Sequence, residues 1–253
     1  MSSEPLFDFH ARLAPRPGAA ERLLSTMDST GIARAAVAAG GTIDLVRLSR
    51  QLIDGGHVET DADNAGVLAA CQRSGGRLIP VYFANPHRPA DRYAAAAADF
   101  RGLEVSPAVH GVPLTDPRVR ELVAVAGEAR HSVYVVCLDR AGCRVGDLVS
   151  LATAFPATTF VLGHSGIGNI DYWAVELVAD VPNIWLETSG GYSTVLRAAL
   201  DRLGAGRLLF GTEYPLQHPS VELAKYAAVA PDPLAWRRIG WQNAESLLEL
   251  ERT

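Results

Sequence analysis

The chain has 253 residues, of which 48% are hydrophobic and 20% are charged, a composition that suits one large core and excludes a disordered chain. The formal net charge is −5 and no basic run occurs, so nothing indicates a nucleic-acid partner. No apolar leader or membrane-length segment is found, and the three cysteines lack Cys-x-x-Cys spacing, so we expect a cytoplasmic protein without membrane, disulfide framework or zinc knuckle.

Short apolar strands alternate with helical segments along the whole chain. The expected strands are Leu6–Phe9, Ile32–Ala39, Leu78–Phe83, Leu103–Ser106, Val133–Val136, Phe160–Gly163, Ile184–Leu186 and Leu208–Gly211. The expected helices are Gly18–Thr30, one ending near Cys71, Arg118–Arg130, Asp147–Phe155 with Asp147 as N-cap, Tyr172–Val178, Thr194–Leu203, and helices from Val221 onward, with Asn243 opening the last. This alternation predicts an α/β protein that is a single (β/α)8 TIM barrel spanning residues 1–253.

Many of these strands end on an ionisable side chain, and the carboxyl ends of barrel strands meet at one face. The expected set at that face is Asp8, His10, Arg12, Glu104, Ser106, Cys137 or Asp139, His164, Glu187 and Glu213. Two imidazoles with carboxylates are a plausible ligand set for Zn²⁺ or another divalent ion. The sequence therefore predicts a site at the carboxyl ends of the strands.

Each of these residues also has a structural interpretation. His10 and His164 can be core histidines, although a strand end makes that the weaker interpretation. Glu187 is more often a supporting carboxylate than a ligand, and Cys137 alone is more often a small buried hydrophobe. Among the remaining histidines, His110 is the best candidate because its loop leaves a strand end.

Six segments spread over almost the whole chain carry a family resemblance: Phe7–His10, Arg101–Pro107, Phe160–Gly166, Asn183–Gly190, Leu208–Pro215 and Gln242–Ala244. The chain resembles the amidohydrolase-related family of metal-dependent hydrolase barrels. That family includes aminocarboxymuconate-semialdehyde and resorcylate decarboxylases and several lactonases and hydratases. The resemblance implies functional roles for His10 and His164, and for Glu213 in place of the family's strand-eight Asp.

The chain departs from the family pattern at two metal-ligand positions. Where the family usually opens with Asp-x-His-x-His, this chain reads Asp8-Phe9-His10-Ala11-Arg12, and a guanidinium stays cationic and cannot ligate. The family's fifth-strand His is replaced by Val136 or Cys137, depending on the alignment. A cation at Arg12 would repel a divalent ion bound a few ångströms away.

Three hypotheses follow. The first, which we favour, is a metal-independent enzyme that hydrolyses a lactone- or amide-type bond in a small carboxylated or carbonyl substrate, with Arg12 on a substrate carboxylate and Glu213 or His164 as general base. In the second, His10, His164 and Glu213, with or without Cys137, hold one divalent ion, Zn²⁺ first, for hydrolysis or decarboxylation. The third is a non-catalytic scaffold or partner protein on the same barrel.

The partner expected from the first two hypotheses is a small anionic molecule. The catalytic residues would be Glu213, His164 and His10, and those assigned to substrate binding are Arg12, Glu104, His110, Cys137, Glu187 and Tyr214. The sequence does not choose between hydrolase and lyase, does not name the substrate, and leaves a homo-oligomer open.

Overall fold

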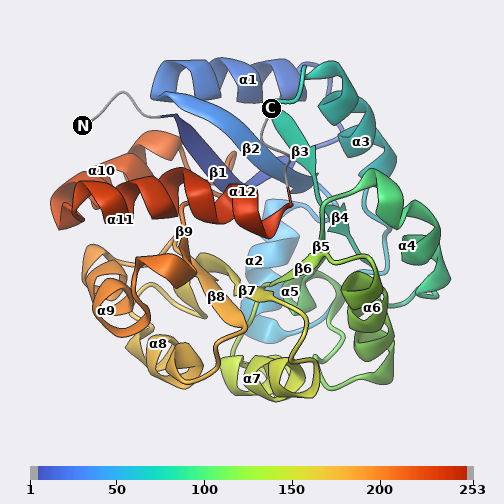
Figure 1. Cartoon of the computed structure of the whole chain (residues 1–253). Coiled ribbons are helices and arrows are strands. Elements are labelled where there is room, and N and C mark those ends of the chain that lie inside the picture. The colour runs from blue at the N-terminus through green and yellow to red at the C-terminus, as the bar shows by residue number, and fades with distance from the viewer. Residues whose placement is uncertain (1–4, 250–253) are drawn as a thin grey trace.

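The strands of the protein run parallel and lie at the centre of a ring of helices (Figure 1), in a computed structural model that describes residues 5–249. Its strands are β1 (Leu6–Leu13), β2 (Ile32–Ala39), β3 (Leu78–Pro80), β4 (Tyr82–Phe83), β5 (Gly102–Val105), β6 (Ser132–Val135), β7 (Phe160–Leu162), β8 (Ile184–Glu187) and β9 (Leu208–Leu209). All ladder pairs are parallel, as the predicted barrel requires.

The strands pair in the order β1-β2-β3 and β4-β5-β6-β7-β8-β9. The predicted third strand is broken at Val81, whose N–H donates to Val37 O at 2.9 Å, so β3 and β4 are two halves of one barrel strand. At the other join, Phe9 N donates to Phe210 O at 2.8 Å and Arg12 N donates to Tyr214 O at 2.7 Å. Hydrogen bonds thus connect the two sheets at both edges, and the (β/α)8 fold class is confirmed.

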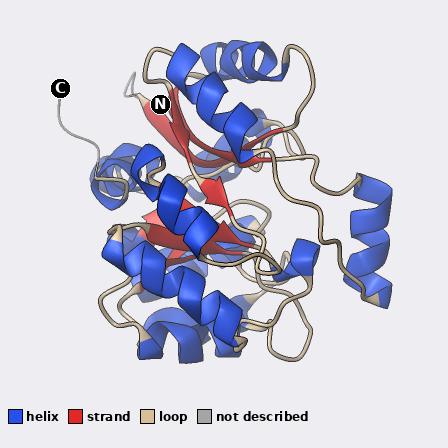
Figure 2. Ribbon diagram, turned by 90° about the vertical axis from the view of Figure 1, so that its right-hand side faces the viewer, coloured by secondary structure: helices blue, strands red, loops and turns tan. Residues whose placement is uncertain are grey.

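The helices form the outer layer (Figure 2). They are α1 (Ala19–Thr30), α2 (Leu45–Asp54), α3 (Asn64–Arg73), α4 (Asp91–Ala96), α5 (Pro107–His110), α6 (Pro117–Glu128), α7 (Val145–Ala154), α8 (Tyr172–Ala179), α9 (Ser193–Leu203), α10 (Pro219–Val229), α11 (Pro233–Arg237) and α12 (Asn243–Leu247), with a π-helical turn at Arg238–Gln242. None of the helices among these described residues is long and apolar enough to cross a membrane. The cytoplasmic location and the single domain over 1–253 stay predictions.

The start of α7 differs from the prediction. The helix begins at Val145, so Arg144 is the N-cap and Asp147 is not. Asp147 instead lies in the first turn, where its carboxylate accepts a hydrogen bond from Arg144 N at 2.9 Å. The predicted N-cap was wrong by three residues because Asp147 lies inside the first turn and satisfies the backbone N–H of the N-cap residue from there.

Two packed layers of apolar side chains hold the barrel. Alternate strand residues fill its interior, among them Phe7, Phe9, Tyr134, Val161 and Leu209. Their sequence neighbours on the strands point outward and pack under the helices. This alternation matters for the site because it decides which residues of each strand reach the inside of the barrel.

Arg207, which directly precedes β9, is hydrogen-bonded to the end of α8. Its guanidinium donates to the carbonyl oxygens of Val178 (3.1 Å), Ala179 (2.7 Å) and Val181 (2.9 Å), which belong to the end of α8 and the turn after it. A cation placed on the last carbonyls of a helix both caps them and complements the helix dipole. Arg207 therefore ties the start of β9 to the segment that leads into β8.

We expect Arg207→Met to lower the free energy of unfolding by about 2 kcal/mol, since several buried carbonyls lose a charged donor. Arg207→Lys should restore only part of the loss, because an ammonium cannot reproduce the planar fork. The measurement is urea unfolding beside Arg50→Met, which removes an exposed arginine from α2. Equal stability of the Arg207 and Arg50 variants would contradict this role.

Candidate active site

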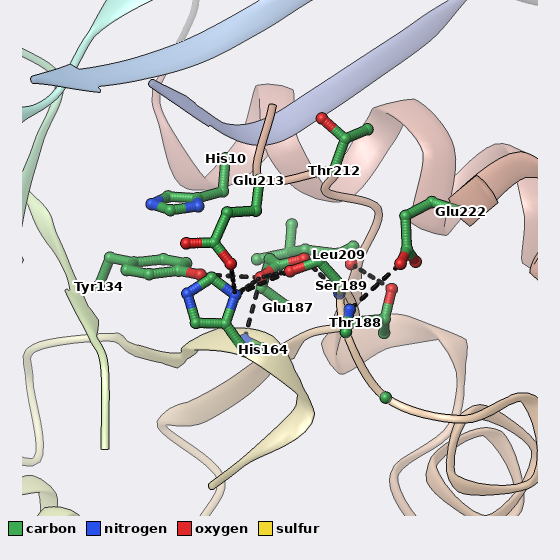
Figure 3. Close-up of polar contacts among 12 residues, drawn as sticks. His10, Tyr134, His164, Glu187, Thr188, Ser189, Leu209, Thr212, Glu213 and Glu222 are labelled. Atoms are coloured by element: carbon green, nitrogen blue, oxygen red, sulfur yellow. Dashed lines mark hydrogen bonds and ion pairs between the residues drawn. The ribbon is translucent and has the colours of Figure 1, made fainter. Parts of the chain in front are cut away.

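Side chains from the ends of several strands converge at one end of the barrel. His10 and Arg12 come from β1, Glu104 from β5, His164 from the turn after β7, and Glu213 from the segment after β9. One ligand atom each from His10, His164 and Glu213 lies within 4.8 Å of the other two. Figure 3 shows these three side chains pointing toward one another. The predicted convergence of strand ends therefore places all three in reach of one small ligand.

The backbone is strained at two of these residues. His164 has φ 58° and Glu213 has φ 54°, both in the left-handed region that residues other than glycine rarely adopt. Hydrogen bonds hold both conformations: Glu213 N donates to His10 O at 2.8 Å, and His164 N donates to Glu187 Oε2 at 3.1 Å. Such strain persists only where surrounding contacts over-determine it, and it gathers at functional sites.

His164 and Glu213 form an ion pair. His164 Nδ1 lies 2.9 Å from Glu213 Oε2 and also 2.9 Å from Ser189 Oγ. Burial disfavours the charged imidazole, but the Glu213 carboxylate outweighs it and raises the pKa of His164. Burial likewise opposes ionisation of Glu213, yet His164 and Arg12 lower the pKa of that carboxyl to about 2. The pair can therefore offer an imidazolium donor beside a carboxylate acceptor.

Arg12 lies between two carboxylates. Its Nη2 donates to Glu104 Oε1 at 2.6 Å, and its Nε lies 3.6 Å from Glu213 Oε1. Glu104 is fully buried, and although burial opposes its ionisation, Arg12 and His10 lower the pKa of its carboxyl to about 2. The guanidinium also lies 5.5 Å from the ring centre of Phe83. A substrate carboxylate would thus meet a cation that already has two anionic neighbours.

Glu187 supports the site through the hydrogen bonds that it accepts. It is fully buried, and its two oxygens accept hydrogen bonds from Tyr134 Oη (2.8 Å), Ser189 N (2.6 Å) and Ser189 Oγ (2.9 Å), besides the His164 N–H. The carboxylate needs a glycine beside it, because a Cβ on Gly211 would collide with Glu187 Oε1. These contacts fit the supporting role that sequence reasoning gives to Glu187; its assignment to substrate binding stays a prediction.

Tyr134 is the functional candidate that sequence reasoning missed. Its ring stacks on His10 with centroids 4.1 Å apart and meets the His164 ring edge-on at 5.9 Å. Burial and the surrounding carboxylates hold the pKa of its hydroxyl well above the ordinary value. Strand alternation was the available signal: Tyr134 and Val136 pack with the barrel interior, whereas Cys137 lies in the outer core.

Three predicted substrate-binding residues lie further out. Cys137 is buried in the outer core, and burial raises the pKa of its thiol. His110 is buried against Phe83 at a ring distance of 5.4 Å, and burial lowers its pKa to about 4. Tyr214 is half-buried and adjoins the site through its backbone, which accepts from Arg12 N. A substrate-binding role for these residues stays a prediction.

The donor set also fits one divalent ion. Two imidazoles and a carboxylate are a common set for such ions, with further positions left for water or substrate. His10 Nε2 faces Glu104 at 3.4 Å, whereas the buried His10 Nδ1 has no hydrogen-bond partner among residues 5–249 and can take a ligand bond. Arg12 opposes this, because its charge lies next to Glu213. The residues are thus compatible with no metal or with one.

The sequence profile of a family described as amidohydrolase matches residues 8–250. A gamma-resorcylate decarboxylase from Polaromonas sp. (strain JS666 / ATCC BAA-500) is 30% identical over 118 residues, which are 39% of this chain and 36% of that relative. The chain is therefore matched to only about a third of that relative's length.

Solved structures share the fold. A protein assigned as a 2-pyrone-4,6-dicarboxylic acid hydrolase from Pseudomonas putida superposes with a TM-score of 0.74 at 18% identity over 98% of each chain. The manganese-bound 5-carboxyvanillate decarboxylase from Novosphingobium aromaticivorans gives a TM-score of 0.74 at 15% identity over 99% of this chain and 100% of its own. At such identities the likeness shows the barrel fold.

We expect Glu104→Gln to lower the free energy of unfolding by about 3 kcal/mol, because it leaves the Arg12 guanidinium with one carboxylate fewer in a buried place. Urea unfolding of this variant should be compared with Glu121→Gln, the same change at an exposed position of α6. Stabilities that agree within about 0.5 kcal/mol would show that Glu104 does not balance Arg12.

Proposed function

The chain belongs to the amidohydrolase family, and from this premise we propose that it hydrolyses a lactone- or amide-type bond in a small carboxylated substrate without requiring a metal ion. The observation that carries the proposal is the guanidinium of Arg12 between Glu104 and Glu213. It supplies a fixed positive charge in the part of the site where the family resemblance leads one to expect a metal-binding imidazole.

The residues divide the chemistry as follows. The ionised Glu213 takes a proton from a water molecule as the water oxygen attacks the substrate carbonyl carbon. The protonated His164, held by Glu213 and Ser189 through Nδ1, donates a hydrogen bond from Nε2 to the carbonyl oxygen, on which negative charge develops. The carbonyl then re-forms as the C–O or C–N bond of the lactone or amide breaks, and the leaving oxygen or nitrogen takes the proton that Glu213 received from water. Arg12 adds electrostatic stabilisation and favours an anionic substrate. Because a carboxylate with a pKa of about 2 is a weak base, the reaction depends on these donors.

His10 and Tyr134 form one wall of this site. Their stacked rings fill the barrel next to the His164–Glu213 ion pair, and Tyr134 Oη donates a hydrogen bond to Glu187. The wall shields the catalytic pair from the barrel interior and keeps the local dielectric low, which strengthens the electrostatic terms.

A divalent-metal-dependent decarboxylase or hydrolase is the second candidate. It is favoured by the three-donor set and by the buried Nδ1 of His10, which has no hydrogen-bond partner in the part of the chain that the structure describes. His10, His164 and Glu213 would hold the ion, which would supply Lewis-acid polarisation of a substrate oxygen or a more acidic water. The 5-carboxyvanillate decarboxylase structures hold manganese with a nitrobenzoic acid, which makes manganese the ion to test beside zinc. A homo-oligomer and a cytoplasmic location also stay proposals.

The two candidates separate on metal-stripped protein. We expect chelator-treated enzyme to keep full activity toward at least one carboxylated lactone, including 2-pyrone-4,6-dicarboxylate, the substrate in the names of two structural neighbours. Arg12→His should raise divalent-metal affinity while weakening anion binding, because it removes a cation and restores a ligand. Activity that disappears on stripping and returns with Mn²⁺ or Zn²⁺ would favour the second candidate.

A non-catalytic barrel is the third alternative, and Glu213 tests it. We expect Glu213→Gln to lower the turnover rate by roughly 10²–10⁴, the usual loss when one general acid–base group is removed. Glu213→Asp should keep part of the activity, because the group is the same and only its reach changes. The rates are measured beside Glu121→Gln. Full activity of Glu213→Gln would remove this residue from the mechanism.

A further inference from the structure

A second cluster of metal-ligand residues lies on the same end of the barrel, outside the candidate active site. His57 and Glu59 belong to the loop between α2 and α3, and His87 follows β4. His57 Nε2 lies 3.6 Å from Glu59 Oε1, and His87 Nδ1 lies 4.0 Å from the same oxygen. One atom from each of the three residues lies within 4.8 Å of the others.

The orientation of His87 prepares it for a ligand. Its Nε2 lies 2.8 Å from the backbone oxygen of His110, and because a carbonyl can only accept, Nε2 carries the proton. In the neutral ring this leaves the lone pair on Nδ1, the atom that faces Glu59. Metal-binding histidines almost always donate their other ring nitrogen to a carbonyl or carboxylate in this way.

The spacing of the three atoms is close to that of a bound ion. Donors of a tetrahedral zinc site, each about 2.0–2.1 Å from the metal, lie about 3.4 Å from one another. The distances of 3.6 and 4.0 Å from the two imidazoles to Glu59, and the upper limit of 4.8 Å among all three residues, therefore need side-chain movements to bring the donors together. Such movement is available, because the side chains of His57 and Glu59 are 49% and 60% exposed.

The surrounding charges permit a cation. Arg88 and Arg92 share Asp61 at 2.9 and 3.2 Å, and Arg118 forms two 2.9 Å bonds with Asp116. Two further guanidinium groups, those of Arg47 and Arg140, donate to the backbone oxygens of His57 and Gly56. The carboxylate of Glu59 remains for the imidazoles of His57 and His87. Two imidazoles and one carboxylate match the protein ligands of many three-ligand zinc sites, with the fourth position open to water.

We propose that His57, Glu59 and His87 bind one divalent transition-metal ion, of which zinc is the best match, at a site separate from the candidate active site. The two sites have no residue in common, and the side chains of Phe83 and His110 lie between them: Phe83 contacts Arg12 on one side and His110 on the other. The inference does not depend on whether the active site uses a metal.

The ion would join the loop after α2 to the segment after β4, which hydrogen bonds from Asn85 Nδ2 and Arg88 Nη2 to the backbone oxygen of Glu59 already connect, both at 2.9 Å. Helix α2 stands away from the barrel in Figure 2, and its Leu45, Val46 and Ile53 are exposed. Gln51 anchors it through hydrogen bonds to Ala108 O and Val109 O at 2.6 and 2.9 Å. Arg140 Nη2 also donates to Gln51 O at 3.0 Å. A metal bridge from the loop after α2 to His87 would add to these hydrogen bonds, and so further restrict the segment that lies over this end of the barrel.

The test is a Co²⁺ titration of purified, chelator-treated full-length protein, followed by visible absorption and by calorimetry for stoichiometry. We expect Glu59→Gln and His57→Gln to bind one equivalent fewer than the wild type and Glu121→Gln, and to lack the tetrahedral cobalt bands that this equivalent produces. The affinity of Glu59→Gln and His57→Gln for Co²⁺ at this site should fall by at least about 10- to 100-fold, which is the loss caused by removing a residue that only hydrogen-bonds to a metal ligand. Glu213→Gln should keep this equivalent, since it alters only the other site.

The side chains of His57 and Glu59 are exposed, so both variants should fold. Their melting temperatures in the absence of metal check this. Zn²⁺ should also slow amide hydrogen exchange over residues 55–61 in the wild type and not in Glu59→Gln. Unchanged stoichiometry and affinity in Glu59→Gln and His57→Gln, or no binding by the wild type, would overturn the site. Binding without any protection of residues 55–61 would overturn the anchoring role.

Discussion

The structure depends on the balance of charge around Arg12. A guanidinium that is largely buried must be neutralised, and two carboxylates from different strands do this, Glu104 at 2.6 Å and Glu213 at 3.6 Å. Glu213 is in turn shared with His164 at 2.9 Å. Alternating charges thus connect β1, β5, the turn after β7 and the segment after β9. The same contacts that neutralise the buried arginine also arrange a proton acceptor beside a proton donor.

This arrangement explains why the family's barrel can change its chemistry without changing its fold. The barrel is held by apolar layers inside and outside the strands, whereas the reactive groups sit on the strand ends and the turns that follow. At those turns His164 and Glu213 adopt left-handed backbone conformations, which cost free energy that the barrel core can supply. Replacing one imidazole by Arg12 then alters the charge of the site while the strands keep their packing.

The sequence was sufficient to predict the barrel and most of the strand-end set. Apolar runs with ionisable ends mark β1, β7, β8 and β9, because a buried parallel strand leaves a clear pattern. The break at Val81 and the start of α7 were missed, since both depend on hydrogen bonds between residues that the pattern does not join. The pairing of Arg12 with Glu104 spans 92 positions and has no local signal.

Other parts of the site needed the structure for different reasons. Tyr134 lies within an apolar strand and carries no strand-end signal, although alternation shows that it points inward and that Cys137 points outward. The left-handed backbone at His164 and Glu213 cannot be expected from residue type, because neither is glycine or asparagine. His57 and His87 come from distant loops, so only the fold shows that they share Glu59.

The most direct test of the charge-balanced site is a crystal structure of the wild type grown with excess Mn²⁺ or Zn²⁺, with anomalous scattering recorded at the metal edge. The account predicts no anomalous peak among His10, His164 and Glu213, with Arg12 still bound to Glu104. A fully occupied peak among those three residues, with the Arg12 guanidinium displaced from Glu213, would contradict it.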